Sequence, residues 1–284
     1  MTVKQVGLVG SGIMSSGVAE VVAKAGMDVA LRSRTQEAVD AMVAGLEKSL
    51  AKQVEKGKLD DAASAEIRGR VRAVTDLSEL SSCDLVLESV VEDITVKKQL
   101  FTDLDDVCAN AKILATNTST LSVGDIAAAT KNPERVCGIH FFNPAPVMPL
   151  VEIVRAEKTG SATVSGARTF AEACGKTVVD VIDRAGFIVN SLLFPYLNNA
   201  VKALDAGLAT RDDIDAAMKG GCNFPMGPLE LLDLVGLDTS LSILEALHDE
   251  YQDPNYVPAP MLEQMVGDGR LGRKTGQGFY DYSK

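Results

Sequence analysis

Near the start of the chain, continuous runs of apolar residues alternate with segments in which apolar residues recur at helical spacing. Residues 3–10 form an apolar, β-branched run that ends in glycine, as a buried strand does. Residues 14–26 carry valines and alanines at helical spacing, and residues 28–32 form a second short apolar run. The order strand, glycine turn, helix, strand predicts the opening of a doubly wound sheet.

The same alternation continues to about residue 182. Residues 36–58 and 60–70 have helical periodicity, which predicts a helical hairpin inserted between strands. Strand-like runs follow, with helical stretches between most of them, at 84–89, 112–117, 135–140 and 150–155, with a further candidate at 177–182. This pattern predicts an α/β, Rossmann-type doubly wound sheet that is mostly parallel.

Beyond residue 186 the periodicity is helical throughout. The helical stretches are 190–207, 210–221, 228–251 and 259–269. We therefore place a boundary near residues 183–187. The prediction is a dinucleotide-binding Rossmann-type domain over 1–184 and an all-α C-terminal domain over 185–284.

Composition excludes several classes of function. The net charge is −11, and no cluster of basic residues offsets it, so we expect no binding to nucleic acid or to an anionic membrane. No apolar stretch is long enough to cross a bilayer, and the N-terminus has no signal-peptide pattern. These features predict a cytoplasmic protein.

The cysteine pattern gives neither a metal site nor a disulfide framework. The number of cysteines is odd, and no two of them are spaced as C-x-x-C. They are Cys83, Cys108, Cys137, Cys174 and Cys222. We expect free thiols in a reducing compartment and no bound metal.

A glycine-rich turn links the first predicted strand to the first predicted helix. It contains Gly10, Ser11, Gly12, Ile13 and Met14. Gly10 permits the tight turn, and Gly12 lets a pyrophosphate approach backbone N–H groups at the positive end of the helix. The alternative is a glycine-rich turn without a ligand. Its position after a strand and before a helix favours dinucleotide binding.

The end of the second predicted strand distinguishes NAD from NADP. An NAD enzyme usually places an acid there to bind the ribose 2′-hydroxyl. This chain instead has Arg32, Ser33 and Arg34, whose guanidiniums and hydroxyl suit a 2′-phosphate. The alternative is a solvated turn in an NAD enzyme. We expect NADP as the cofactor, in preference to NAD.

His140 is the strongest catalytic candidate. The chain has two histidines, and His248 lies in a polar stretch that predicts a surface position. His140 closes a predicted strand, at the sheet edge where ligands bind in doubly wound folds. Glu152 follows twelve residues later, inside a buried-looking strand where an unpaired carboxylate would be costly. The two predict a proton-transfer pair.

Six ordered segments carry a resemblance to a known family. They are GSGIMSSGVAE (10–20), ATNTSTLSV (115–123), GIHFFNPAPVMPLVEIV (138–154), GFIVNSLLFPYLNNA (186–200), FPMGPLELLDLVGLDT (224–239) and LGRKTGQGFYDYSK (271–284). Along essentially its whole length the chain resembles the 3-hydroxyacyl-CoA dehydrogenase family, in particular its short bacterial 3-hydroxybutyryl-CoA type.

The resemblance implies a role for each matching residue. His140 corresponds to the catalytic base and Glu152 to its partner. Ser119 and Asn190 match positions that bind the reacting oxygen and the substrate carbonyl. Further cofactor-binding positions are Glu92, Lys97, Asn117, Ser119, Asn143 and Lys274. Ser49 and Lys56, in the predicted hairpin, match CoA-binding residues. The family also implies an acyl-CoA substrate and a homodimer formed through the helical domain.

Four departures from the family pattern accompany the resemblance. Ser15 and Ser33 stand where most NAD-dependent members have a glycine and an acid, as in members that use NADP. Ala185 replaces a common proline and Thr120 a second serine, and we expect neither change to affect the chemistry.

Two other functions are compatible with the same fold. One is the oxidation of a free hydroxy acid such as gulonate, which would not need Ser49 and Lys56. The other is a non-catalytic, NADP-binding structural or sensor protein, which would not need the set Ser119, His140, Glu152 and Asn190.

Overall fold

The protein consists of two compact units. In the computed structural model, which describes residues 2–283, one unit ends at Asp183 and the other begins at Arg184. The division falls one residue before the boundary expected from the sequence. Each unit is described by itself.

The first unit is built on an eight-stranded sheet. Its strands are β1 (Gln5–Gly10), β2 (Asp28–Arg32), β3 (Val71–Val74), β4 (Leu85–Ser89), β5 (Ile113–Thr116), β6 (Val136–Phe141), β7 (Leu150–Arg155) and β8 (Thr177–Ile182). The order is β3-β2-β1-β4-β5-β6-β7-β8, and every neighbouring pair is parallel except β6 and β7. The predicted doubly wound, Rossmann-type fold is confirmed.

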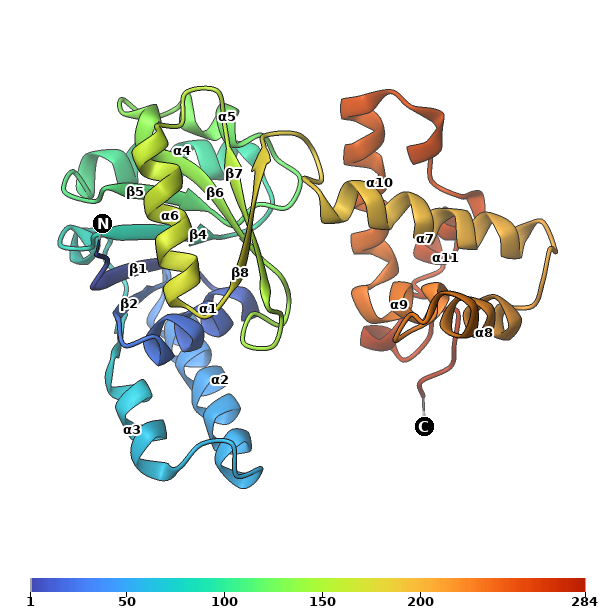
Figure 1. Ribbon diagram of the computed structural model, residues 1–284, viewed down its shortest axis with the longest axis horizontal. Helices are drawn as coiled ribbons and strands as arrows, with labels where there is room; N and C mark the ends of the chain where they lie inside the picture. Colours follow the sequence, from blue (N-terminus) through green and yellow to red (C-terminus); the bar gives the residue numbers. More distant parts are fainter. Residues whose placement is uncertain (1, 284) are drawn as a thin grey trace. The chain divides into compact units, whose positions relative to one another are not determined.

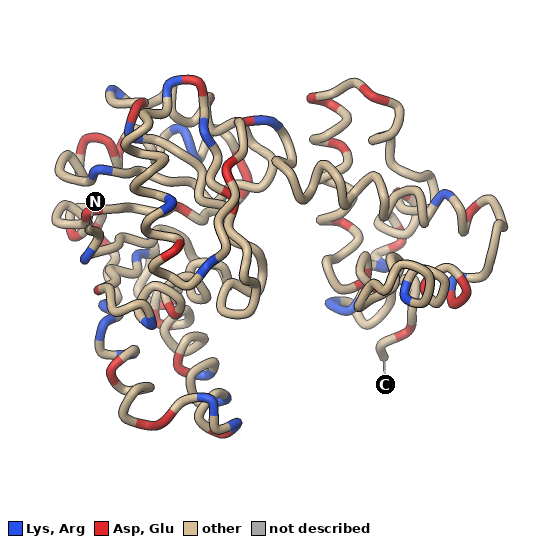
Figure 2. The backbone as a smooth tube through the Cα atoms, in the orientation of Figure 1, with Lys and Arg blue, Asp and Glu red and all other residues tan. Residues whose placement is uncertain are grey.

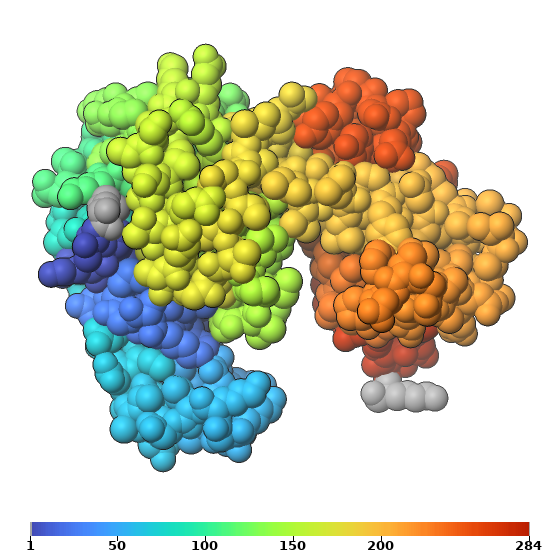
Figure 3. Space-filling view, viewed as in Figure 1, coloured from blue at the N-terminus to red at the C-terminus, as the bar shows by residue number. Residues whose placement is uncertain are grey.

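Helices cover both faces of this sheet (Figure 1). They are α1 (Ile13–Lys24), α2 (Gln36–Glu55), α3 (Asp61–Gly69), α4 (Ile94–Val107), α5 (Val123–Ala127) and α6 (Ser161–Ala173). The main apolar core joins one face of the sheet to α1, α2 and α6. Helix α4 contacts β5 and helix α5 contacts β6, and neither helix contributes to this core. In the space-filling view, α6 lies across the front of this unit (Figure 3).

Strand alternation decides which side chains can meet. In β6, Cys137, Ile139 and Phe141 belong to the core on the α1 and α6 side. Successive strand residues point to opposite faces, so His140 points to the other face. The same rule applies to β7, where Val151 and Ile153 join that core and Glu152 points away.

The predicted helical hairpin is present as α2 and α3. Side chains of Thr35 and Asp60 cap the two helices by accepting backbone N–H bonds. The hairpin extends from the sheet (Figures 1 and 3), and acidic and basic residues are interspersed along it (Figure 2).

The second unit is all helical over the residues described. Its helices are α7 (Val189–Asp205), α8 (Arg211–Cys222), α9 (Pro228–Val235), α10 (Leu237–Tyr251) and α11 (Pro260–Gly267). They enclose a core of their own, which contains Phe194, Leu229 and Leu244. Between residues 2 and 283, no helix is long and apolar enough to cross a membrane.

Two elements differ from the sequence-based prediction. The helical stretch 228–251 is two helices, because Gly236 has a φ of +103° and interrupts the hydrogen-bonding pattern. Strand β3 was not predicted. It has only four residues and pairs with β2 at the edge of the sheet, so its apolar pattern is too short to recognise.

Candidate active site

His140 and Glu152 form a buried pair on the face of the sheet opposite the main core. They are register partners in the antiparallel strands β6 and β7. His140 Nδ1 lies 2.8 Å from Glu152 Oε2, and the residues are 4% and 0% exposed. An ionised carboxylate can only accept a hydrogen bond, so Nδ1 carries the proton. Nε2 is then the basic nitrogen of the ring.

The Ser119 side chain lies on the other side of the imidazole. Its Oγ is 3.0 Å from His140 Nε2. With the proton on Nδ1, the serine hydroxyl donates to Nε2. The ring of Phe142 packs against the imidazole at a centroid distance of 4.5 Å. The imidazole is therefore held from three sides, with Nε2 directed toward a hydroxyl.

The turn that carries Ser119 is held by the carboxylate of Glu92. Glu92 Oε1 accepts the backbone N–H of Ser119 at 2.8 Å and that of Thr120 at 3.2 Å, and also the Thr118 hydroxyl. Burial alone would raise the pKa of Glu92, but Lys97 and these hydrogen bonds outweigh it and lower the pKa. Glu92 is therefore an ionised anchor for the turn.

Lys97 is buried beneath this turn. It is 1% exposed, and its Nζ lies 2.6 Å from Glu88 Oε1 and 3.3 Å from Glu92 Oε2. Both carboxylates neutralise the ammonium, which makes its burial tolerable. Glu92 thus holds the Ser119 turn by hydrogen bonds, and Lys97 holds Glu92. The cofactor-binding role expected of both residues is a separate prediction.

Asn117 ties three strand ends together. Its Oδ1 accepts the backbone N–H of Phe141 at 2.7 Å, and its backbone N–H donates to the Glu88 carbonyl at 2.8 Å. Its Nδ2 donates to Ser89 Oγ at 3.3 Å. Asn117 therefore fixes the loop after β5 against the neighbours of His140.

The glycine-rich turn has space for a phosphate group. Helix α1 begins at Ile13, and no side chain caps it at Gly12, where an added Cβ would meet nothing within 4 Å. Ser15 packs against Gly10, and its buried Oγ has no hydrogen-bond partner among the described residues. Open N–H groups and an unpartnered hydroxyl fit an anion or its bound water.

One pocket of about 520 Å³ joins this turn to the end of β2. Residues from the turn and from β2 line it together, namely Gly10, Ser11, Arg32, Ser33 and Arg34. Leu77, Val90 and Leu100 supply apolar walls. A pocket with apolar walls, a phosphate turn and two guanidiniums fits the adenosine half of a dinucleotide.

Arg32 and Arg34 repel each other in this pocket. Burial, followed by the charge of Arg34, lowers the pKa of Arg32, and Asp76 partly offsets this. Arg32 Nε donates to the Thr75 carbonyl at 3.0 Å, which fixes the guanidinium. An anion bound between the two arginines would relieve the repulsion.

A second groove, of about 550 Å³, lies between α1, α2 and the loop after β6. It is lined by Ser49 and Asn143, and also by Ser11, Gly12 and Ile13 of the turn. Met14 is half-buried against the core. Lys56 is exposed at the end of α2, seven residues beyond Ser49. This spacing places the two residues on one side of the helix.

Two residues expected at the site belong to the second unit. Asn190 lies in the first turn of α7 and is 8% exposed. Lys274 pairs with Asp238, with Nζ 2.6 Å from Oδ2. Their functional roles remain predictions.

Glu88, a fully buried carboxylate in β4, was not predicted from the sequence as a site residue. Its Oε2 accepts the Thr116 hydroxyl at 2.7 Å. The signal was available, because an acid within the apolar run LVLES is as unusual as Glu152 within LVEIVR.

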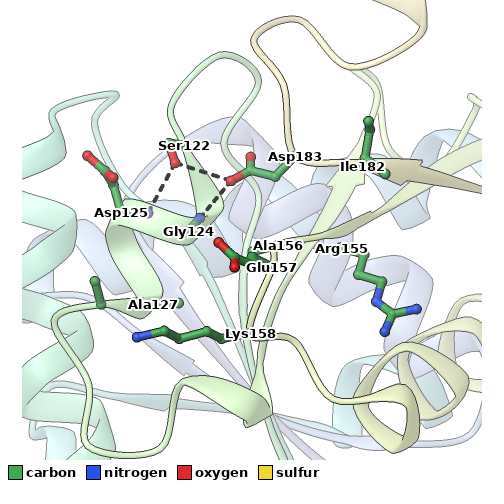
Figure 4. Close-up of a pocket in the computed structure, with 11 residues that line it drawn as sticks. Ser122, Gly124, Asp125, Ala127, Arg155, Ala156, Glu157, Lys158, Ile182 and Asp183 are labelled. Carbon is green, nitrogen blue, oxygen red and sulfur yellow. Dashed lines mark hydrogen bonds between the residues drawn. The ribbon is translucent and has the colours of Figure 1, made fainter.

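Another hollow of the first unit is lined by none of the residues expected to be catalytic. Figure 4 shows Asp183 facing the start of α5, where it accepts the Ser122 hydroxyl at 3.1 Å and the Gly124 N–H at 2.7 Å. Neither His140 nor the phosphate turn lines this hollow. Over residues 2–283, no cluster of three or more His, Cys, Asp or Glu residues is arranged to hold a metal ion.

Comparison with known families shows which family the chain belongs to. The NAD binding domain of 3-hydroxyacyl-CoA dehydrogenase matches residues 5–184, and the C-terminal domain of the same enzyme matches residues 186–282. The chain belongs to the 3-hydroxyacyl-CoA dehydrogenase family. It is accordingly an NAD(P)-dependent oxidoreductase, as the resemblance implied.

Full-length relatives support this family assignment. The chain is 46% identical to a 3-hydroxybutyryl-CoA dehydrogenase of Clostridioides difficile, covering 98% of this chain and 99% of the relative. It is 41% identical to human mitochondrial hydroxyacyl-coenzyme A dehydrogenase, covering 99% and 91%. The crystal structure of (S)-3-hydroxybutyryl-CoA dehydrogenase PaaH1 from Ralstonia eutropha superposes with a TM-score of 0.96 at 39% identity, covering 100% of both chains.

Proposed function

We propose that this 3-hydroxyacyl-CoA dehydrogenase interconverts an (S)-3-hydroxyacyl-CoA and its 3-oxoacyl-CoA, with 3-hydroxybutyryl-CoA and acetoacetyl-CoA as the pair. The observation that carries the proposal is the buried His140–Glu152 pair, which keeps the proton on Nδ1 and makes Nε2, beside Ser119, the basic nitrogen. The names of the full-length relatives support the choice of substrate.

The proton transfer follows from the geometry of the pair. A bound nicotinamide cofactor would supply the hydride chemistry. His140 Nε2 takes the proton of the substrate hydroxyl in oxidation and returns it to the carbonyl oxygen in reduction. Glu152 holds the ring and stabilises the imidazolium. Ser119, and in this proposal Asn190, bind the oxygen on which charge develops.

We assign the cofactor as NADP rather than NAD. The phosphate turn and Arg32 to Arg34 line one pocket, and no acid from the end of β2 lines it. Repulsion between the two arginines favours an anion there, and a 2′-phosphate supplies one. The fit of Gly12 and Ser15 to an anion supports dinucleotide binding but does not discriminate between the two cofactors.

We assign CoA recognition to Ser49 and Lys56. Ser49 lines the groove beside the phosphate turn, and Lys56 is an exposed cation seven residues further along the chain. A hydroxyl and an ammonium on one side of a helix suit the phosphates of CoA.

We also propose a homodimer formed through the second unit. Several large apolar side chains of that unit are exposed, including Leu192 at 71% and Leu208 at 79%. Burial of such side chains is what an oligomer interface provides. Sedimentation of the full chain should give twice the mass of one chain, and a monomer at micromolar concentration would refute the dimer.

A substrate and cofactor matrix tests the proposal. Acetoacetyl-CoA is assayed with NADPH and with NADH, and a free hydroxy acid such as gulonate is assayed with NADP+ and with NAD+. We expect turnover of acetoacetyl-CoA with NADPH above NADH, and none of the free acid. Turnover of the free acid alone would replace the proposed substrate. Cofactor binding without turnover of either substrate would favour a non-catalytic protein.

A further inference from the structure

Two hydrogen-bonded routes run from one buried carboxylate, Glu88, to the turn that carries Ser119. Glu88 and Thr116 are register partners in β4 and β5, just as His140 and Glu152 are in β6 and β7. Leu87 and Ala115 belong to the core on the α1 and α6 side, so Glu88 and Thr116 point to the same face as His140.

The first route passes through Thr116. The Thr116 hydroxyl donates to Glu88 Oε2 at 2.7 Å and accepts the backbone N–H of Thr118 at 3.2 Å. The Thr118 hydroxyl in turn accepts the N–H of Leu121 at 3.0 Å. This route fixes the start of the turn.

The second route passes through charges. Lys97 Nζ lies 2.6 Å from Glu88 Oε1 and 3.3 Å from Glu92 Oε2. Glu92 then accepts the backbone N–H of Ser119 at 2.8 Å. Glu88 is 0% exposed, and its carboxylate accepts hydrogen bonds from the Val90 N–H, Lys97 and Thr116, which help to hold the loops that follow β4 and β5.

We infer that Glu88 is a positioning residue for Ser119. It acts through Thr116 and through the Lys97–Glu92 pair, and it keeps the Ser119 hydroxyl at hydrogen-bond distance from His140 Nε2. This inference rests on the proposed function for its effect on rate. Its effect on the hydrogen bond of His140 does not depend on the substrate.

A double-mutant cycle tests the connection. Glu88→Gln, Ser119→Ala and the double variant are compared for kcat and KM with acetoacetyl-CoA and NADPH. If Glu88 acts through Ser119, Glu88→Gln lowers kcat about tenfold or more and changes KM by less than about threefold. The double variant then stays within about threefold of Ser119→Ala. If the loss of kcat in the double variant equals the product of the losses in the two single variants, the inference is overturned.

The matched control is Asp105→Asn, which also removes the charge of a buried ion pair. Asp105 Oδ1 lies 2.7 Å from Arg135 Nη2, and neither residue contacts the Ser119 turn. Its effect on kcat should be small and should multiply with that of Ser119→Ala. If Asp105→Asn lowers kcat as much as Glu88→Gln does, and the loss likewise does not multiply with that of Ser119→Ala, the effect of Glu88→Gln is a general loss of stability. That outcome would overturn the inference.

A spectroscopic readout separates this inference from the proposed function. The chain has two histidines, so the imidazole resonances of His140 can be assigned by comparison with a His248→Gln variant. Glu88→Gln and Ser119→Ala should shift them in the same direction, whereas Asp105→Asn should not. Unshifted resonances in folded Glu88→Gln would overturn the inference, whether or not acetoacetyl-CoA is a substrate. If Glu88→Gln does not fold, Thr116→Val replaces it, with the same outcomes.

Discussion

Glu152 lies directly opposite His140 across the antiparallel strands β6 and β7, with its Oε2 2.8 Å from Nδ1 of the imidazole. The pairing register decides this contact. A slip by one residue would turn Glu152 to the opposite face of the sheet. The one antiparallel pair in the sheet therefore builds the proposed catalytic dyad.

The first prediction concerns the carboxylate of the dyad. In Glu152→Gln the side chain keeps its shape, but its neutral amide stabilises the imidazolium less. We expect kcat for acetoacetyl-CoA reduction to fall by about 10- to 1000-fold, with the KM for NADPH nearly unchanged. Circular dichroism and a thermal melt monitor folding. A folded variant with wild-type kcat would mean that Glu152 has no part in proton transfer.

The second prediction concerns the choice of cofactor. Arg34 is exposed at the edge of the adenosine pocket. Arg34→Ala should raise the KM for NADPH about tenfold, as expected for one lost charge-assisted hydrogen bond, and leave the KM for NADH unchanged. Arg168→Ala is the control, since Arg168 pairs with Asp180 elsewhere in the first unit. Equal losses with both cofactors would contradict the assignment of the 2′-phosphate site.

The third prediction concerns CoA. Lys56→Ala should raise the KM for acetoacetyl-CoA several-fold without changing kcat, because a ground-state contact is lost. The KM for acetoacetyl-N-acetylcysteamine, which lacks the nucleotide, should not change. Lys58, which is also exposed, gives the matched control Lys58→Ala. If both thioesters respond equally to Lys56→Ala, Lys56 does not recognise the nucleotide part of CoA.

The fourth prediction concerns stability at acid pH. Burial would raise the pKa of Asp105, but hydrogen bonds from Arg135, Lys131 and Asn132 lower it. A lowered carboxyl pKa contributes stability above the pKa of the unfolded chain, about 3.9, and this contribution is lost as pH falls through the lower folded value. Urea unfolding should show a smaller loss of stability in Asp105→Asn than in wild type below about pH 4. Parallel curves would contradict this.

The sequence predicts most of the sheet because its central strands are continuous apolar runs with clear boundaries. β1, β4 and β6 are of this kind, whereas β3 has the pattern VRAV and lies at an edge, where little burial is required. Gly236 was not recognised as a helix break because the apolar periodicity continues on both sides of it.

The sequence predicts those site residues whose own position in the pattern is unusual. His140 stands at a strand end, and Glu152 is an acid in an apolar strand, so both could be recognised. The burial of Lys97 could not, because helix α4 by itself gives no sign that this lysine turns toward Glu88 and Glu92. The partners of the Ser119 turn are brought together by the parallel pairing of β4 and β5, which follows from topology.

The most direct test of the account is the turnover of His140→Gln with acetoacetyl-CoA and NADPH. Glutamine fills part of the same space but cannot take up the proton. We predict a fall in kcat of at least about 100-fold, with a thermal melt close to that of wild type and unchanged NADPH binding. A folded variant with near wild-type turnover would contradict the assignment of His140 as the proton-transfer group.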